Sequence, residues 1–324
     1  MKVLVYAGAL TQDHKRKIND TAASVNAQVV YVDSVEEITE EHLDAEAVYG
    51  FGFNIMSAEK LRESKNLKWL SVTSAGVDFL MKPGLFANED LIITNSAGAY
   101  GVSIAEHIIA VSLMMMRKLT YHYASSIEGE WAPPVMQRSL KDSRITVWGT
   151  GDIGSSFAKR AKAFEPACII GVSRSGIRKD PVYDSMITSA EIDEILPKTD
   201  LLVMSLPGTA ETNGILSRER LNLLPQGAYV VNVGRGNAID EEALADCLEE
   251  GRIAGAALDV FRTEPLPKDS RLWKTKNLLI TPHVAGNLTL PYTVDKNVEM
   301  FCENLVAYAN GQPLKHVVDK ALGY

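Results

Sequence analysis

The sequence has few cysteines and no long apolar run, and each shortage excludes a class of protein. Three widely spaced cysteines are present, Cys168, Cys247 and Cys302. We therefore expect reduced thiols in a cytoplasmic protein, without a disulfide framework or a metal site. No apolar run approaches the ~18 residues that a membrane span needs. The apolar run at residues 1–7 is short for a signal peptide, and we interpret it as a strand.

Basic residues are also too few and too scattered to attract a polyanion. The 324 residues include 33 Lys and Arg against 41 Asp and Glu, which gives a net charge of −8. This balance argues against nucleic acid and anionic membranes as partners. An anionic small molecule could still bind if an arginine were placed locally. The length and the 46% hydrophobic content fit a soluble globular chain of two domains.

Apolar and polar segments alternate in two regions, each with the pattern of a parallel sheet covered by helices. In the first region we expect strands at residues 3–6, 28–32, 47–51, 69–73 and 92–94. In the second we expect six, at residues 145–148, 168–172, 201–205, 228–233, 256–260 and 278–281. Six strands is the number in a full dinucleotide-binding sheet.

Two further segments indicate how these regions are connected. Gly98 and Gly101 precede an apolar helix expected over residues 102–116, and glycines in that place suit a hinge. A last helix, expected over residues 292–309, could return to the first domain. We therefore predict an α/β fold in which residues 100–287 form a dinucleotide-binding domain. This domain is inserted into a substrate domain made of residues 1–99 and 288–324, with a cleft between the two.

A glycine motif, Gly149-x-Gly151-x-x-Gly154, lies between a predicted strand and a predicted helix. Gly149 would permit the tight turn, Gly151 would let the backbone approach a pyrophosphate, and Gly154 would let the helix pack on the strand. The start of that helix, at Asp152 and Ile153, offers free N–H groups and a positive dipole end to phosphates. This motif alone is weak evidence, because glycines are common in turns, but the surrounding strand and helix favour a nucleotide site.

The end of the next predicted strand indicates which cofactor is bound. An NAD site has an acidic residue there, about 20 residues beyond the glycines, to bind the ribose 2′-OH. This sequence instead has Ser173, Arg174 and Ser175, with Arg178 and Lys179 nearby. Serine would not repel a 2′-phosphate and Arg174 would bind it, so we predict a preference for NADP(H). The alternative is a basic surface loop in an enzyme that uses NAD(H).

Three segments that follow strands of the second region carry Arg235, Glu264 and His283. Taken singly, each has an ordinary interpretation: a surface arginine, a solvated glutamate and a structural histidine. However, the carboxyl ends of parallel strands form the edge where ligands bind in open α/β sheets. We therefore expect the three side chains to lie on the same edge as the nucleotide site.

The motifs together resemble the D-isomer-specific 2-hydroxyacid dehydrogenases over nearly the whole chain, and the glyoxylate/hydroxypyruvate reductase branch in particular. The motifs that carry the resemblance are Ser74-Ala75-Gly76-Val77-Asp78, Ala105-Glu106-His107, the glycine motif, Val233-Gly234-Arg235-Gly236, Leu258-Asp259-Val260-Phe261, Glu264-Pro265-Leu266-Pro267 and Thr281-Pro282-His283. Those for the branch are Ser173-Arg174 and the ending at residues 318–324. The resemblance implies a flavodoxin-like substrate domain and a Rossmann domain.

The resemblance also implies a role for each site residue. His283 would be the acid in reduction and the base in oxidation, Glu264 would orient it, and Arg235 would hold the substrate. Ala75 and Gly76 would donate backbone N–H groups to the substrate carboxylate. Asn54, Ile55, Met56 and residues near Ser74 would line the pocket. Asp259 would bind the nicotinamide carboxamide. The other expected cofactor contacts are Gly149, Gly151, Asp152, Ile153, Gly154, Ser173, Arg174, Ser175, Leu206, Pro207, Val233, Gly234 and Gly286.

The resulting prediction is an NADP-dependent reductase of small 2-oxo acids. An NAD-dependent D-2-hydroxyacid or phosphoglycerate dehydrogenase is the alternative, and formate oxidation is a further reaction found on this scaffold. A nucleotide-sensing corepressor is an alternative of another class, but the Arg235, Glu264 and His283 set argues against it. We also expect a homodimer. The aromatic and proline-containing segment 119–140 lies outside the pattern of strands and helices and would suit such a contact.

Overall fold

The computed structural model describes residues 1–50, 60–62, 64–81, 84–86, 88–177 and 180–323. The chain divides into two compact units. Unit 1 comprises residues 1–100 and 287–324, and unit 2 comprises residues 101–286.

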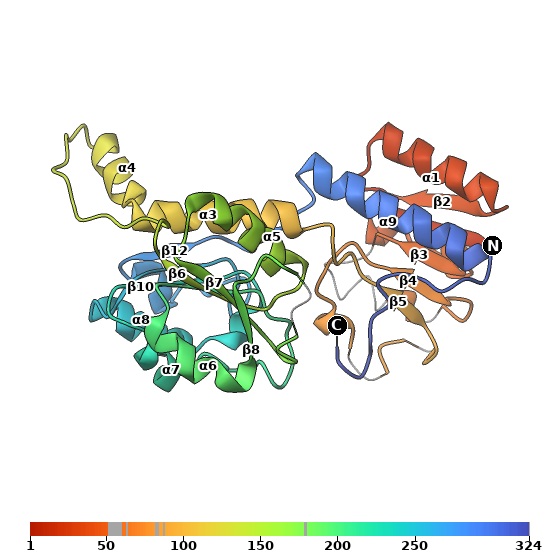
Figure 1. Ribbon diagram of the computed structural model, residues 1–324. Coiled ribbons are helices and arrows are strands. Elements are labelled where there is room, and N and C mark those ends of the chain that lie inside the picture. Colours follow the sequence, from red (N-terminus) through yellow and green to blue (C-terminus); the bar gives the residue numbers. More distant parts are fainter. Residues whose placement is uncertain (51–59, 63, 82–83, 87, 178–179, 324) are drawn as a thin grey trace. The chain divides into compact units, whose positions relative to one another are not determined.

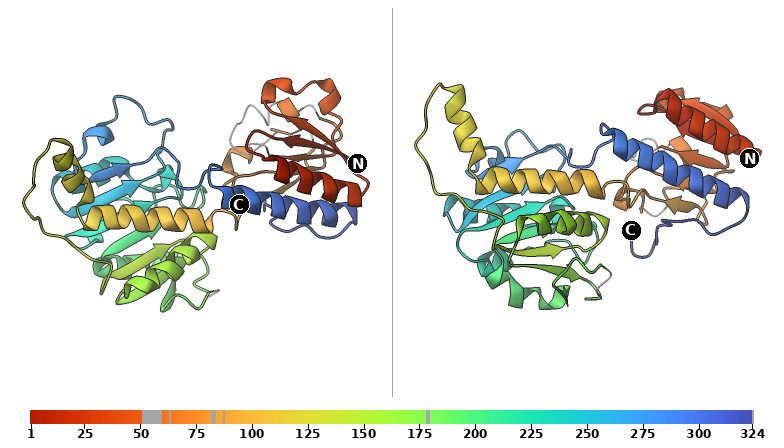
Figure 2. Two further views of the ribbon diagram at one scale, coloured as in Figure 1. Left: turned by 90° about the horizontal axis from the view of Figure 1, so that it is seen from above. Right: turned by 45° about the horizontal axis from the view of Figure 1, so that its top comes forward.

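Unit 1 is built on a parallel five-stranded sheet (Figure 1). Its strands are β1 (Lys2–Tyr6), β2 (Gln28–Val32), β3 (Ala47–Tyr49), β4 (Trp69–Ser71) and β5 (Ile92–Thr94). The order β2-β1-β3-β4-β5 is that of flavodoxin-like sheets. Helices α1 (Gln12–Ser24) and α9 (Pro291–Ala309) lie side by side, as Figures 1 and 2 show.

Helix α9 joins the core of unit 1 although it comes from the other end of the sequence. The Phe301 ring stacks on Tyr49 of β3, with ring centroids 4.2 Å apart. Trp69 of β4 and Phe301 are both fully buried. Burying large aromatic side chains is strongly favourable, so this apolar face holds the C-terminal helix in unit 1. Residues 287–324 accordingly group with residues 1–100 in one compact unit.

Unit 2 has a parallel seven-stranded sheet, one strand more than we predicted. Its strands are β6 (Arg144–Trp148), β7 (Cys168–Ser173), β8 (Ser185–Thr188), β9 (Leu201–Met204), β10 (Ala228–Asn232), β11 (Ile253–Leu258) and β12 (Leu278–Ile280). Strands β6 to β11 follow the Rossmann order, and β12 is added at one edge. The missed strand, β8, lies at the other edge. It is short and no residue in it is fully buried, so its apolar pattern is weak.

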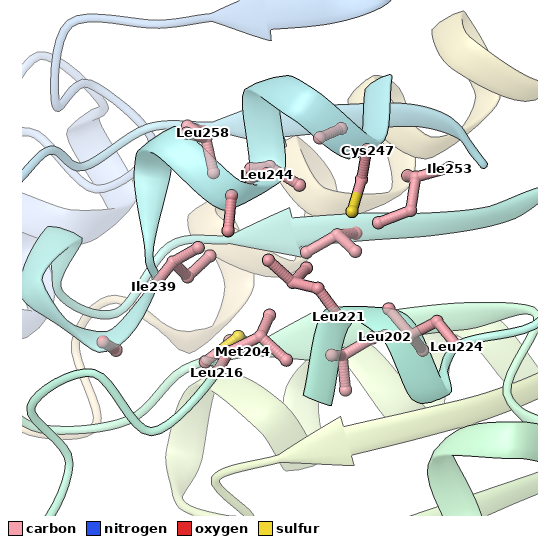
Figure 3. Packing of buried hydrophobic residues seen from close by; sticks show 14 of the residues in the cluster. Leu202, Met204, Leu216, Leu221, Leu224, Ile239, Leu244, Cys247, Ile253 and Leu258 are labelled. Carbon is pink, nitrogen blue, oxygen red and sulfur yellow. The ribbon is translucent and has the colours of Figure 1, made fainter. Parts of the chain in front are cut away.

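Two layers of helices cover this sheet. Helices α3 (Gly101–Met116) and α5 (Asp152–Ala161) lie on one face, and α6 (Ile192–Ile195), α7 (Arg218–Leu223) and α8 (Glu241–Glu249) on the other (Figure 1). Under the second layer, Leu202 and Met204 of β9 pack among the leucines of α7 and α8 (Figure 3). The predicted α/β fold, with a Rossmann domain inserted into a flavodoxin-like one, is confirmed.

We expected segment 119–140 to lie outside the pattern of strands and helices, and the structure corrects this. The first part of the segment forms helix α4 (Leu119–Ile127), which Figures 1 and 2 show projecting from the end of α3. Lys118 has φ of 54° and separates the two helices. We call residues 119–140 the arm. Its exposed apolar side chains are Leu119, Tyr121, Tyr123, Ile127, Trp131 and Met136.

Among the helices that the structure describes, none is both long and apolar enough to cross a membrane.

Candidate active site

The glycine motif forms a turn that brings β6, β9 and α5 together. Gly149 has φ of 104°, and a Cβ there would lie 2.6 Å from the carbonyl oxygen of Ser205, which follows β9. A Cβ on Gly154 would lie 2.0 Å from the carbonyl oxygen of Gly149. Both positions therefore exclude a side chain. This turn lies between β6 and β9, where the strand order of the sheet reverses and nucleotides bind in such folds.

Gly151 differs from the other two glycines because a Cβ there would meet no atom within 4 Å. It is the N-cap residue of α5 and offers no side chain to the first N–H groups of that helix. Open space beside unpaired N–H groups fits the phosphates of a dinucleotide. Asp152 has turned its carboxylate toward Gly101 at the start of α3, so it would meet a phosphate through its backbone.

The residues from which we predicted the cofactor preference, Ser173, Arg174 and Ser175, lie at the end of β7 and in the polar turn that follows it. Ser173 Oγ accepts a hydrogen bond from the N–H of Gly176, and Ser175 Oγ accepts one from Ile177. These bonds shape the turn and leave the side chain of Arg174 exposed. Arg178 and Lys179 lie outside the described residues.

Arg235 follows β10 and is held by bonds within its own loop. The buried Asn232 accepts from the N–H of Gly234 and donates to the carbonyl oxygen of Arg235. Gly234 packs against Leu206, where a Cβ would lie 2.6 Å from backbone atoms. We did not predict that Asn232 holds the backbone of this loop. The sequence does contain an indication of it, because an asparagine directly before a glycine-rich loop often bonds to local backbone.

A second close contact connects the loop of Arg235 to that of Glu264. A Cβ on Gly236 would lie 1.8 Å from the carbonyl carbon of Phe261, so only glycine fits. The N–H of Phe261 donates to Glu264 Oε1 at 2.8 Å. The backbone of the first loop therefore packs directly on the turn that holds Glu264.

Glu264 and His283 form a hydrogen-bonded pair, with 2.7 Å between Glu264 Oε2 and His283 Nδ1. His283 has φ of 53°, a conformation that is uncommon for residues with side chains and clusters at functional sites. Its N–H donates to the carbonyl oxygen of Asp259, which fixes the backbone. Half of the imidazole is exposed, and Nε2 is the ring nitrogen that remains for a ligand.

The pair shifts the pKa values of both groups in the directions that favour charge. The hydrogen bond to Glu264 raises the pKa of His283 above its ordinary value, although burial and the Arg235 charge oppose it. Burial acts to raise the pKa of Glu264. The hydrogen bonds from His283 and Phe261, together with the positive charges of His283 and Arg235, outweigh burial, so the pKa of Glu264 is lowered. The site can therefore hold an imidazolium close to an arginine.

Asp259 is buried and organises the chain around His283. Its carboxylate accepts bonds from the Thr281 hydroxyl at 2.6 Å and from the N–H groups of Val284 and Ala285 at 2.9 and 3.0 Å. His107 of α3 lies 3.4 Å from the Thr281 hydroxyl. A carboxylate has about four acceptor positions, so one remains for the predicted nicotinamide contact.

The trio of Arg235, Glu264 and His283 thus comes together within unit 2. Ala75 and Gly76 belong to unit 1, on the turn after β4, where Asn95 donates to the carbonyl oxygen of Ala75. The neighbouring Ser74 hydroxyl is buried and has no hydrogen-bond partner among the described residues. Asn54, Ile55 and Met56 lie outside the described residues.

Comparisons with known proteins agree with this geometry. A model of the D-isomer specific 2-hydroxyacid dehydrogenase NAD binding domain matches residues 109–285. A glyoxylate reductase from Thermofilum pendens is 30% identical over 298 residues, which are 89% of this chain and 85% of that protein. A D-3-phosphoglycerate dehydrogenase from Archaeoglobus fulgidus is also 30% identical over 88% of this chain, but the match spans only 54% of that protein.

Solved structures show the same likeness over the whole chain. A 2-hydroxyacid dehydrogenase family protein from Aeromonas salmonicida has 30% identity and a TM-score of 0.85, covering 98% of this chain and 99% of that one. A D-isomer specific 2-hydroxyacid dehydrogenase from Xanthobacter autotrophicus, in complex with NADPH and MES, has 29% identity and a TM-score of 0.81. The match covers 99% of both chains.

Proposed function

Since the chain belongs to the D-isomer specific 2-hydroxyacid dehydrogenases, a family of NAD(P)-dependent oxidoreductases, we propose that it reduces small 2-oxo acids with NADP(H) as preferred cofactor. The substrates would be of the glyoxylate and hydroxypyruvate type and the products D-2-hydroxy acids. The observation that carries the proposal is the His283–Glu264 pair beside Arg235, in the domain that carries the glycine motif.

The roles of the three residues follow from their chemistry. The nicotinamide ring, when bound, supplies the hydride. His283 gives the proton on Nε2 to the ketone oxygen, and Glu264 keeps Nδ1 protonated and the ring oriented. Arg235 binds the substrate carboxylate through its planar fork of N–H donors. Backbone N–H groups of Ala75 and Gly76, with Asn54, would bind the same carboxylate or line the pocket.

The cofactor would lie along the carboxyl edge of the unit 2 sheet. Its pyrophosphate would meet the open turn at Gly151 and the backbone of Asp152 and Ile153, since this turn leaves room for it. Leu206, Pro207, Val233, Gly234 and Gly286 would contact the rest of it, and Asp259 the carboxamide.

Arg174 supports the choice of NADP(H) over NAD(H). Its exposed guanidinium follows Ser173 at the end of β7, where an acidic residue would bind the 2′-OH of NAD. The Xanthobacter relative was solved with NADPH. We propose that Ser173, Arg174 and Ser175 bind the 2′-phosphate.

The cofactor assignment is tested by kcat/KM for NADPH and NADH, measured with a panel of 2-oxo acids. A charge-assisted hydrogen bond contributes ~1.5–3 kcal/mol, so Arg174 should favour NADPH roughly ten- to a hundredfold. Arg174→Ala should raise KM for NADPH and leave NADH nearly unchanged. Arg16→Ala, which removes an exposed arginine of unit 1, is the control. Equal wild-type values for both cofactors would contradict the assignment.

We also propose that the chain forms a homodimer through the arm. An exposed set of aromatic and aliphatic side chains, on the projecting helix α4 and the segment that follows it, fits an isologous contact with a second copy.

A further inference from the structure

Glu241 makes a contact that its position in the sequence does not explain. It is the first residue of α8, and the neighbouring Asp240 already caps that helix by accepting from the N–H of Ala243 at 3.0 Å. Glu241 instead reaches away from α8, and its Oε1 accepts the N–H of Arg262 at 2.7 Å. The bond connects α8 to the turn between β11 and the proline that follows Glu264.

That turn holds two carboxylates on consecutive N–H groups. The N–H of Phe261 binds Glu264 at 2.8 Å, and the N–H of Arg262 binds Glu241 at 2.7 Å. Glu264 then binds His283 with its other oxygen, at 2.7 Å. A continuous path therefore leads from the start of α8 through the turn to the imidazole.

The 261–264 turn depends on the Glu241 bond, because few other contacts hold its backbone in place. Residues 262–265 are exposed and belong to no helix or strand. Phe261 is buried against Gly236, which fixes the beginning of the turn. The next peptide is fixed by Glu241, which is partly buried. Without that bond, the chain from Arg262 to Glu264 would keep few described contacts besides the Glu264 bonds themselves.

We propose that Glu241 is a positioning residue, which holds the 261–264 turn so that Glu264 remains bonded to His283. This inference rests on the proposed function, because it assigns Glu241 a part in the same proton transfer. Glu241 touches neither the substrate nor the imidazole. Its contribution is a hydrogen-bond acceptor at the right reach, and not its charge.

The charges around Glu241 and His283 allow the effect of the Glu241 hydrogen bond to be separated from the effect of its charge. Arg262, Glu242 and Glu264 act on Glu241, and burial, the first cause, raises its pKa above the ordinary value. Glu264, Arg235 and Asp259 act on His283. Glu241 is therefore two steps removed from the imidazole. Losing only its charge should change the pKa of His283 little, whereas losing its bond should release Glu264.

Four variants test this distinction. Glu241→Gln keeps the length and an acceptor oxygen but removes the charge. Glu241→Asp keeps the charge but is one methylene too short to reach the Arg262 N–H. Glu241→Ala removes both. Glu242→Gln changes the adjacent, exposed carboxylate, which pairs with Arg271 instead, and is the matched control.

We expect Glu241→Asp and Glu241→Ala to lose kcat roughly tenfold, a part of the ~10²–10⁴-fold that general acid catalysis contributes. Their KM for NADPH should stay within about twofold of wild type. The limb of the pH profile that reports His283 should move to lower pH, because a less well-held Glu264 raises the imidazole pKa less. Glu241→Gln and Glu242→Gln should match wild type in both respects. A loss in Glu241→Gln, or wild-type behaviour of Glu241→Asp, would overturn the proposal.

A titration of the His283 ring by NMR separates this inference from the proposed function. The signal is assigned by its absence in His283→Asn, and the titration needs no substrate. If no 2-oxo acid is reduced, the proposed function fails, yet a lower His283 pKa in Glu241→Asp would still support the positioning role. If reduction occurs and the pKa is the same in every variant, only the positioning role fails. Should Glu241→Ala not fold, the Gln and Asp variants decide.

Discussion

His283 combines an unusual backbone conformation with a charged hydrogen bond. Its positive φ is maintained by the bond from its N–H to Asp259 and by the bonds of Val284 and Ala285 to the Asp259 carboxylate. This backbone brings Nδ1 to Glu264, so Nε2 is the ring nitrogen that would face a substrate in the proposed mechanism. Such strain persists only where the surroundings determine it, which is typical of residues that take part in chemistry.

If His283 is the proton donor, its removal should affect turnover far more than cofactor binding. We expect His283→Ala to lose at least ~10²-fold in kcat, with NADPH affinity nearly unchanged. His42→Ala, which removes an imidazole that accepts from the N–H of Thr39 within unit 1, should behave as wild type. Steady-state kinetics and a fluorescence titration of NADPH measure the two quantities. A variant that keeps more than a tenth of the activity would remove His283 from the mechanism.

The raised pKa of His283 predicts the direction of the pH dependence. Reduction needs the imidazolium, so its rate should be full at low pH and fall as pH rises through this pKa. Oxidation needs the neutral ring and should show the opposite dependence. The bond to Glu264 is the main cause that raises the pKa, so Glu264→Gln should move the reductive limb to lower pH. Identical profiles of wild type and variant would show that Glu264 does not tune His283.

At the scale of elements, the turn from β6 to α5 gives each glycine a different physical role. Gly154 lets α5 lie against the backbone of Gly149, and Gly149 lies against Ser205. A Cβ on Gly151 would meet no atom within 4 Å, so this position borders open space. The first two positions therefore serve folding, whereas Gly151 would serve binding.

This difference predicts opposite outcomes for two alanine substitutions. Gly154→Ala places a Cβ 2.0 Å from a backbone oxygen, so we expect a loss of stability of a few kcal/mol, of the order caused by overpacking a core (~1–3 kcal/mol). Gly151→Ala should unfold at nearly the wild-type temperature but raise KM for NADPH roughly tenfold, because its methyl group occupies the phosphate space. Thermal unfolding and kinetics separate the two effects. An unchanged KM in Gly151→Ala would place the phosphates elsewhere.

At the scale of the molecule, the arm exposes large apolar side chains that the rest of this chain does not cover. The Trp131 side chain is fully exposed and Tyr123 is 69% exposed. Exposed apolar groups of this size, gathered on one segment, mark an interaction surface.

We therefore expect a dimer at micromolar concentration, measured by light scattering. Replacing Tyr123 and Trp131 together by Asp should give a monomer, because charge at the centre of such a contact would be buried without a partner. Trp273→Asp is the control, since this tryptophan is about half exposed and lies outside the arm. A wild-type monomer would end the proposal.

The sequence by itself determined the class of fold and pointed to the candidate site residues, whose roles stay predictions. Fully buried strands are continuous apolar runs, and Gly149 and Gly154 of the motif are needed by backbone geometry, so both features are visible locally. The short edge strand β8 was missed because an exposed edge has little apolar signal. Helix α4 was missed because its face is not buried by the rest of the chain, so it lacks the periodicity of a core helix.

Only the tertiary structure decided how the site is held together. Thr281 and Glu241 each bond to a group that folding brings near, and Asp259 uses most of its carboxylate in the same way. Nothing in the spacing of Glu241 and Arg262, 21 residues apart, indicates that they meet. A polar side chain finds its partner only after the apolar strands have set the loops beside one another. A sequence therefore shows which residues can perform the chemistry, and the packing of the loops determines which others hold them in place.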